Sequence, residues 1–178
     1  ALYGGPKAKT TPMGTGPRFG EEDLKYLKEA IDQNTLFYWY GNQVKQLTAR
    51  FAELYGSPYC IATSSGTAAI HVALGICGVT AGDEVITSPV TDMGTIIGIV
   101  YQNAIPVFAD LDPHSYTLDP KSVEAKITDK TKALILNNPS NPTGMMYGEE
   151  ELKGIADVVV KNDLYVISDE VYREFVYG

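Results

Sequence analysis

The sequence predicts an α/β protein with three layers, α/β/α, around a mostly parallel sheet. Five short apolar runs alternate with stretches of helical periodicity from residue 57 onward, which is the pattern of successive βαβ units. Three polar loops directly follow such runs. These are the positions at which parallel sheets bind ligands, because the carboxyl ends of their strands share one edge.

Residues 1–56 are expected to form an N-terminal arm and two helices. Residues 1–20, rich in Gly, Pro, Lys and Thr, predict an extended arm. Helices are predicted over 21–31 and 43–56, and Gly56 ends the second one after an apolar stripe of Val44, Leu47, Phe51 and Leu54. The aromatic bend between them is interpreted as a packing or dimer surface of Phe37, Tyr38, Trp39 and Tyr40.

Residues 57–178 are expected to form part of a larger ligand-binding domain. The apolar runs predict strands at 59–63, 84–88, 106–110, 132–136 and 164–168. Helices are predicted between them at 64–78, 94–104, 119–127 and 148–162. Asp119 and Pro120 form a typical helix start, because aspartate is a good N-cap and proline is tolerated in the first turn.

Composition excludes several classes of function. Fourteen basic against twenty-two acidic residues give a net charge of −8, which argues against binding to nucleic acid or an anionic membrane. The two cysteines, Cys60 and Cys77, are too few for a disulfide framework and form no CxxC motif, so a reducing compartment and no metal site are expected. With no apolar run of membrane-spanning length and no signal-peptide pattern, the expected location is the cytoplasm.

The first loop, SSGTAA at 64–69, joins a predicted strand to a helix N-terminus. Free backbone N–H groups make that position an anion site, Gly66 permits close approach of a ligand, and Ser65 and Thr67 add hydroxyl groups. The loop resembles neither a Walker loop nor GxGxxG, which favours a phosphate smaller than a nucleotide. An ordinary N-cap with a glycine turn is the alternative.

The second loop, NNPSNPTG at 137–144, contains two prolines, Pro139 and Pro142. Each fixes its own φ and biases the residue before it to extended backbone, so the side chain of Asn141 is held in one direction. The alternative is a turn that only starts the next helix, with Thr143 as its cap.

The third loop, SDEVYREF at 168–175, places Asp169 and Glu170 directly after an apolar strand. A partly desolvated carboxylate there favours a cationic partner. Tyr172 follows on the same side if the segment turns helically. The alternative is an exposed acidic cap.

Taken together and in this order, SGTAA, NPSNPTG and SDEVY resemble the fold-type I pyridoxal-phosphate (PLP) enzymes, in particular the aminotransferases. The resemblance covers essentially the whole chain. It implies the large-domain fold of these transferases, PLP as cofactor, and a homodimer that transfers an amino group from a small donor to a keto acid or keto sugar. It also implies that Asn141 and Tyr172 hydrogen-bond the 3′-oxygen of the cofactor ring, that Asp169 pairs with the ring nitrogen, and that the phosphate is held by Ser65, Gly66 and Thr67.

Two branches of these enzymes are represented. Residues 17–133, with GNQVKQLTARFAELYG, SSGTAAIHVAL and AIPVFADLDP, resemble the DegT/DnrJ/EryC1/StrS group, whereas NNPSNPTG and SDEVYREF resemble class I/II amino-acid aminotransferases. A natural hybrid, an engineered chimera and a mixed sequence assignment remain open, as do sugar and amino-acid substrates. The ring-stacking aromatic of the family is not evident, since its place holds Thr91, Asp92 and Met93.

The Schiff-base lysine of the family follows the SDEVY segment, whereas no lysine follows Lys161 here. We therefore expect no catalytic residue among these 178 residues and assign the role to none of the eleven lysines. The expectation is the N-terminal part of an aminotransferase, inactive by itself and without the C-terminal small domain. His71 is interpreted as a packing residue and His114 as a turn residue. A non-catalytic PLP-binding or assembly module, and a phosphate-binding domain without PLP, are the competing functions.

Overall fold

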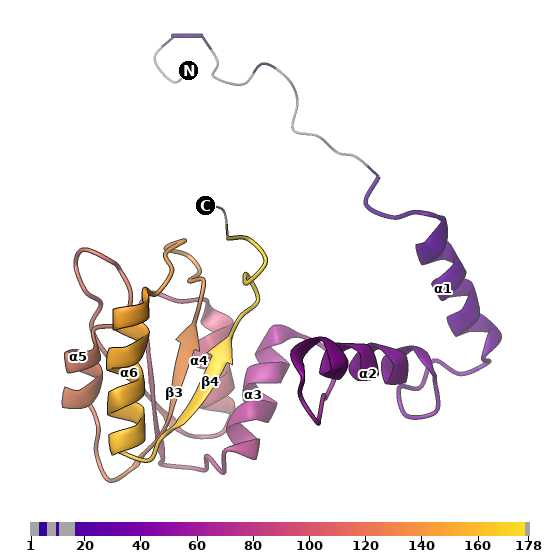
Figure 1. The fold of residues 1–178 in the computed structure, drawn as a ribbon. Coiled ribbons are helices and arrows are strands. Elements are labelled where there is room, and N and C mark those ends of the chain that lie inside the picture. Colours follow the sequence, from indigo (N-terminus) through magenta and orange to yellow (C-terminus); the bar gives the residue numbers. More distant parts are fainter. Residues whose placement is uncertain (1–3, 7–9, 11–16, 177–178) are drawn as a thin grey trace. The chain divides into compact units, whose positions relative to one another are not determined.

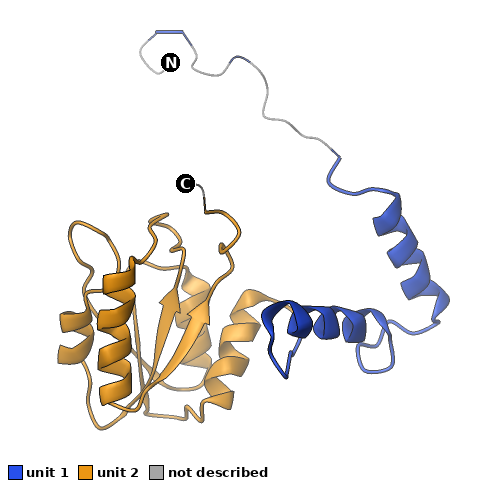
Figure 2. Ribbon diagram, viewed as in Figure 1, with its two compact units in different colours: residues 1–62 blue, residues 63–178 orange. Residues whose placement is uncertain are grey.

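The computed structural model describes residues 4–6, 10 and 17–176, and these divide into two compact units, residues 1–62 and 63–178 (Figure 2). The division lies a little beyond the expected boundary at residue 56, because residues 57–62 group with the N-terminal helices.

The first unit contains two helices, α1 (Glu21–Asp32) and α2 (Gln43–Tyr55). The Asp23 carboxylate accepts a hydrogen bond from the Gly20 N–H (2.7 Å), which satisfies a donor before the first turn of α1. Gly56 ends α2 in the left-handed conformation, with φ of +62°, as its position after the apolar stripe predicts. No residue of either helix is buried.

The expected strand at 59–63 is a wrong prediction: these residues form no strand. An apolar run becomes a strand only where another strand pairs with it, and the four strands of the described sheet pair among themselves. Tyr59 and Ile61 are both exposed, so burial does not hold the run extended either.

The second unit is an α/β sandwich with a parallel sheet, as the sequence predicts (Figure 1). Its strands follow the order β2-β1-β3-β4 across the sheet. The elements in chain order are α3 (Gly66–Ile76), β1 (Glu84–Thr87), α4 (Met93–Tyr101), β2 (Ile105–Phe108), α5 (Pro120–Ala125), β3 (Thr131–Asn137), α6 (Glu149–Lys161) and β4 (Tyr165–Asp169).

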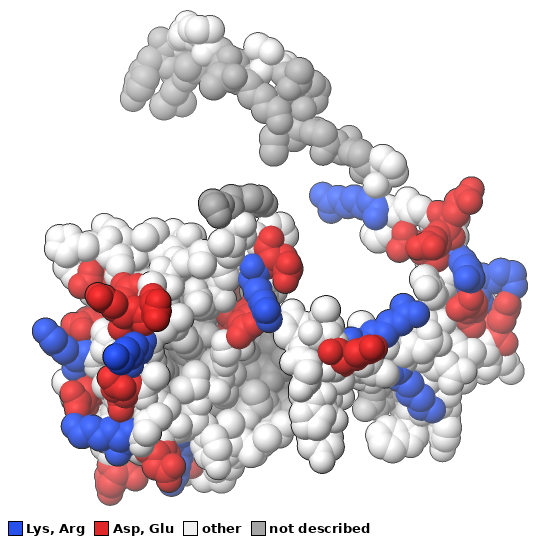
Figure 3. Space-filling model, in the orientation of Figure 1, with Lys and Arg blue, Asp and Glu red and all other residues white. Residues whose placement is uncertain are grey.

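Helices cover both faces of the sheet, which confirms the three-layer architecture (Figure 1). Alternate residues of β1 and β3 point to opposite faces, as the period of two in a strand requires. Ile86, Leu134 and Leu136 pack in one core with α5 and α6, and Val85, Ala133 and Ile135 pack in a second core with α3 and α4. Acidic and basic side chains are interspersed over the outer surface of α5 and α6 (Figure 3), where Lys161 pairs with Glu124 (2.5 Å).

The register of the sheet determines which residues can reach a ligand. Thr87 is paired with Phe108 and Asn137 with Asp169 at the carboxyl ends of the strands. The loops that follow β3 and β4 therefore leave the sheet at the same edge, which is where a parallel sheet of this kind binds ligands.

Candidate functional site

A cleft of about 560 Å³ opens at this carboxyl edge, within the second unit. Small-molecule sites typically have volumes of roughly 300–1,000 Å³, so the cleft has room for a cofactor. Four segments line it: one face of α3, the first turn of α4, and the ends of β3 and β4 with the loops that follow them. The lining includes Gly66, Thr67, Asp92, Gly94, Thr95, Asn137, Asn141, Asp169 and Tyr172.

The first turn of α3 forms one end of the cleft. The Ser65 hydroxyl accepts a hydrogen bond from the Ala68 N–H (3.1 Å), so Ser65 is the N-cap that the alternative interpretation of this loop required. Gly66 and Thr67, whose N–H groups precede that of Ala68, line the cleft. A side chain built on Gly66 would meet no atom within 4 Å, so a ligand can approach the backbone there.

A second helix, α4, begins at the same cleft. The Asp92 carboxylate accepts a hydrogen bond from the Gly94 N–H (2.7 Å), and both residues line the cleft. Thr95, which is buried, follows them and bonds the Thr91 hydroxyl (3.3 Å). In the sequence, Thr91, Asp92 and Met93 are notable only because they stand where the family has its ring-stacking aromatic residue. An aspartate between a strand and an apolar helix was the available signal, because aspartate is a preferred N-cap.

The loop after β3 is fastened by its own hydrogen bonds. The Asn141 N–H donates to Asn137 Oδ1 (2.7 Å), while Ser140 exchanges bonds with Met145 and Gly144, each of 2.9 Å. The Asn138–Pro139 and Asn141–Pro142 peptide bonds are both cis. The alternative interpretation of this loop is wrong, because α6 begins only at Glu149, after an N-cap at Gly148, and Thr143 does not cap it.

The end of β4 places a carboxylate in the cleft. Asp169 is half-buried, and its Oδ1 accepts a hydrogen bond from the Val171 N–H (3.3 Å), so the carboxylate also caps the following turn. Glu170 is exposed and also lines the cleft, where it accepts a hydrogen bond from the Ser168 hydroxyl (2.9 Å) and pairs with Arg173 (3.6 Å). The chain turns through Tyr172, which lines the cleft as the expected helical turn requires.

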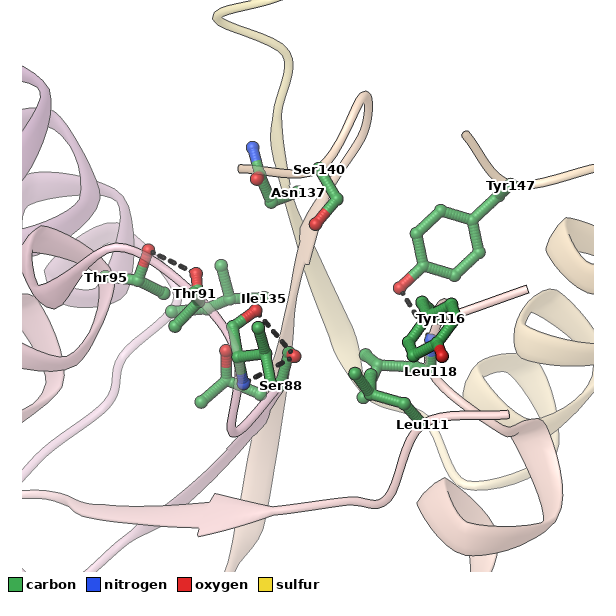
Figure 4. Close-up of a pocket in the computed structure, with 12 residues that line it drawn as sticks. Ser88, Thr91, Thr95, Leu111, Tyr116, Leu118, Ile135, Asn137, Ser140 and Tyr147 are labelled. Carbon is green, nitrogen blue, oxygen red and sulfur yellow. Dashed lines mark hydrogen bonds between the residues drawn. The ribbon is translucent and has the colours of Figure 1, made fainter. Parts of the chain in front are cut away.

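Asn137 is a cleft residue that the sequence reasoning missed. It is the last residue of β3, and its side chain bonds both Asn141 and Asp169. With Thr95 it also lines a neighbouring cavity of about 10 Å³ (Figure 4), about the size that one water molecule needs. An asparagine pair in the loop was visible in the sequence, but which of the two faces the cleft depends on the register of the strands.

Tyr147 borders that small cavity from the opposite side (Figure 4). Its hydroxyl accepts a hydrogen bond from the Leu118 N–H (3.1 Å) within the core. Burial raises the pKa of the Tyr147 phenol above its usual range, because a phenolate would be desolvated there.

The structure thus brings together all the predicted cofactor-binding residues except Ser65. Gly66, Thr67, Asn141, Asp169 and Tyr172 line the one cleft, whereas the Ser65 side chain is engaged as a helix cap. The convergence of the three loops is confirmed, and the cofactor roles of the individual residues stay predictions. No lysine belongs to the described lining of the cleft.

The two histidines have structural surroundings. His71 packs edge-on against the Tyr101 ring at 5.6 Å between centroids, and the His114 N–H donates to Asp112 Oδ1 (2.8 Å) in a turn. In the described part of the chain, no three His, Cys, Asp or Glu residues come together as metal ligands would. None of the described helices has the length and apolar character needed to cross a membrane.

Comparison with known proteins identifies relatives of this chain. One relative, a putative L-glutamine:3-amino-2,3-dideoxy-scyllo-inosose aminotransferase of Streptoalloteichus tenebrarius, is 34% identical over 98% of this chain. The chain spans 41% of the length of that relative.

Solved structures share the fold. 3-amino-5-hydroxybenzoic acid synthase superposes with a TM-score of 0.81 at 24% identity, covering 92% of this chain and 41% of its own. NtdA from Bacillus subtilis, solved with bound cofactor PMP, has a TM-score of 0.71 at 26% identity and covers 84% of this chain and 33% of its own.

The similarity to an amino-acid aminotransferase covers less of the chain. An aspartate aminotransferase double mutant of Thermus thermophilus is 32% identical with a TM-score of 0.57, and covers 63% of this chain and 29% of its own. The family model of the DegT/DnrJ/EryC1/StrS aminotransferase family matches residues 17–171, and so continues beyond residue 133, where the sequence resemblance to this group was expected to end. The chain belongs to the DegT/DnrJ/EryC1/StrS aminotransferase family.

Proposed function

We propose that this chain forms the cofactor-binding part of a PLP-dependent aminotransferase. The observation that carries the proposal is that a helix N-terminus and a carboxylate line the same cleft. Gly66 and Thr67 lie at the start of α3, and Asp169 lies at the end of β4. PLP has matching chemistry, with an anionic phosphate on one side of a ring whose nitrogen can carry a proton.

The residues of the cleft fit this group in three ways. The N–H groups at the start of α3 bind the phosphate, and the Ser65 cap keeps that turn in place. The Asp169 carboxylate holds a proton on the ring nitrogen, because a nearby negative charge favours the protonated form. Asn141 and Tyr172 donate hydrogen bonds to the 3′-oxygen of the ring and so orient it. When bound, PLP supplies an electron-accepting ring that stabilises negative charge on the substrate.

The proposed reaction is amino transfer from L-glutamine to a cyclic polyol ketone. Several relatives support this choice by name, among them the L-glutamine:scyllo-inosose aminotransferase of Streptomyces griseus, which is 30% identical over 95% of this chain. We therefore propose a cyclic ketone rather than a keto acid as the amino acceptor. The proposal also includes residues 57–178 as part of the large domain, a cytoplasmic location and a homodimer, for which the exposed Phe37, Tyr38, Trp39 and Tyr40 provide an apolar surface.

A non-catalytic module that only holds PLP is the second candidate. It is favoured by the cleft lining, since the described residues there include no lysine that could attach the cofactor covalently. Borohydride reduction of the PLP-loaded protein, followed by peptide mapping, separates the two. A pyridoxyl-lysine together with amino transfer supports the enzyme, and reversible binding without either supports the module.

The experiment that tests the leading proposal is a PLP titration followed by a turnover assay. We expect saturable binding that inorganic phosphate weakens, and transfer of nitrogen from L-glutamine to scyllo-inosose, detected as the amine by mass spectrometry. A protein that shows no saturable PLP binding at millimolar concentration would contradict the proposal.

A further inference from the structure

Asn137 ends β3 at the point where the sheet stops and the ligand loops begin. It is half-buried and is paired with Asp169 in the last position of the β3–β4 register. The pairing of β3 with β4 ends at these two residues. Directly after it, the Asn138 N–H donates a hydrogen bond to the Asp169 carbonyl oxygen (3.0 Å), which links the backbones of the two loops.

The Asn137 side chain adds a bridge between the two loops. Its Oδ1 accepts the Asn141 N–H (2.7 Å), and its Nδ2 donates to the Asp169 carbonyl oxygen (3.2 Å). A carboxamide has both an acceptor and a donor, whereas a carboxylate has only acceptors and an aliphatic side chain has neither. The position therefore uses both halves of one amide group.

We propose that Asn137 is a positioning residue. Its carboxamide fixes Asn141 and Asp169 relative to each other so that the side chains of both can contact the same ligand ring. Asn141 and Asp169 come from different loops, and each is joined to the Asn137 side chain through its backbone. Small displacements of groups that orient a reacting ligand are costly. The inference rests on the proposed function for its ligand but concerns an arrangement that exists without one.

Two substitutions separate the halves of the amide. Asn137→Asp keeps the acceptor for the Asn141 N–H and replaces the donor to Asp169 with a second acceptor. Asn137→Leu removes both groups and keeps the branching and the number of non-hydrogen atoms of the side chain. Asn138→Asp is the matched control, because it adds the same charge to the neighbouring residue, whose Oδ1 accepts the Tyr147 N–H (3.3 Å) and which does not line the cleft.

The first measurement needs no ligand. It compares the rate of hydrogen exchange of the Asn141 N–H between the wild-type protein and the variants, each as the full-length chain. We expect Asn137→Leu to speed this exchange at least tenfold, and Asn137→Asp and Asn138→Asp to leave it within about threefold of wild type. Exchange at Asn141 that is unchanged in Asn137→Leu would overturn the proposal, whether or not PLP binds.

The second measurement is the pH titration of the visible absorption of bound PLP. We expect both Asn137 variants to shift its midpoint and to weaken PLP binding about tenfold, with the control unchanged. In an Asp169→Asn background, Asn137→Asp should have less than half of this effect. Equal effects in both backgrounds, or a lowered melting temperature with an unchanged spectral midpoint, would reduce Asn137 to a structural role and overturn the proposal. A wild-type protein without PLP binding would instead contradict the proposed function.

Discussion

The Thr67 hydroxyl occupies the space that a side chain on Gly94 would need. A Cβ atom added to Gly94 would lie 2.7 Å from Thr67 Oγ1 and 2.9 Å from Asp92 Oδ1. The absence of a side chain at Gly94 thus lets the first turn of α4 come up against the first turn of α3, and the two helix N-termini share one cleft.

Replacing Gly94 by alanine is expected to disturb the phosphate end of the cleft. The methyl group would push the Thr67 hydroxyl away, and we expect PLP binding to weaken several-fold, with an overpacking cost of about 1–3 kcal/mol in the free energy of unfolding. PLP titration and urea unfolding measure the two effects.

Gly154→Ala is the control for this substitution. Its Cβ would meet Pro120 Cγ at 2.9 Å, so the crowding is similar but lies between α5 and α6, away from the cleft. We expect Gly154→Ala to lower stability without changing PLP affinity. If the two variants weaken PLP binding equally, the effect of Gly94 is global and the proposed phosphate position loses its support.

Asp169→Asn should separate binding from chemistry. The variant keeps the shape of the side chain but loses the charge that holds a proton on the cofactor ring. We expect PLP to remain bound, because the start of α3 supplies much of the anchoring, while turnover falls on the order of 100-fold or more. Near-normal kcat would count against the pairing of Asp169 with the ring nitrogen, and Glu174→Gln, at an exposed residue outside the cleft lining, serves as the control.

Tyr147→Phe should destabilise the fold without altering the cleft. It leaves the Leu118 N–H buried without the hydroxyl oxygen that accepts its hydrogen bond, a loss of about 1–3 kcal/mol. Urea unfolding at neutral pH measures this change. A variant as stable as wild type would show that water replaces the hydroxyl in the small cavity beside it.

The same tyrosine gives the protein a dependence on alkaline pH. Burial raises the pKa of Tyr147 in the folded state, so the folded protein holds this proton more tightly than the unfolded chain. The stability that results is present below the usual tyrosine pKa and is lost as the pH rises through the raised value. We therefore expect the loss of stability as the pH rises above about 10 to be smaller in Tyr147→Phe than in wild type, as followed by urea unfolding.

Glu151 should act in the opposite direction at acid pH. Its carboxylate accepts hydrogen bonds from the Gly148 N–H (2.6 Å) and the Thr117 hydroxyl (2.8 Å), and these bonds, that of Gly148 first, lower the pKa of Glu151. A lowered pKa contributes stability above the usual glutamate value, which is lost as the pH falls through the lowered one. We expect the free energy of unfolding of Glu151→Gln to fall less than that of wild type as the pH is lowered from about 5 to 3. The exposed Glu150→Gln variant should follow the wild-type dependence on pH. Identical curves for the two variants would contradict this role.

Local patterns predicted most of this fold. The helices α1 and α2, the cap of α5 at Asp119 and four of the strands follow from periodicity and capping residues that act within a few positions. The failure at 59–63 has a different cause, because strand formation depends on a pairing partner that the local sequence does not encode. For the cleft, the rule that loops follow strand ends located Asn141 and Asp169, whereas Gly66 lines the cleft at a helix start that no strand precedes at 59–63. Asn137 depended on the register of the strands, which no short motif specifies, and the capping signal at Asp92 marks a helix start without showing which cleft it borders.

The central claim is that PLP lies across this cleft, with its phosphate at α3 and its ring nitrogen at Asp169. The most direct test is a crystal structure of the protein grown with PLP. We predict phosphate density beside Gly66 and Thr67, the ring nitrogen within hydrogen-bond distance of the Asp169 carboxylate, and the Asn141 carboxamide at the 3′-oxygen. PLP bound outside the cleft, or with its ring nitrogen directed away from Asp169, would contradict the account.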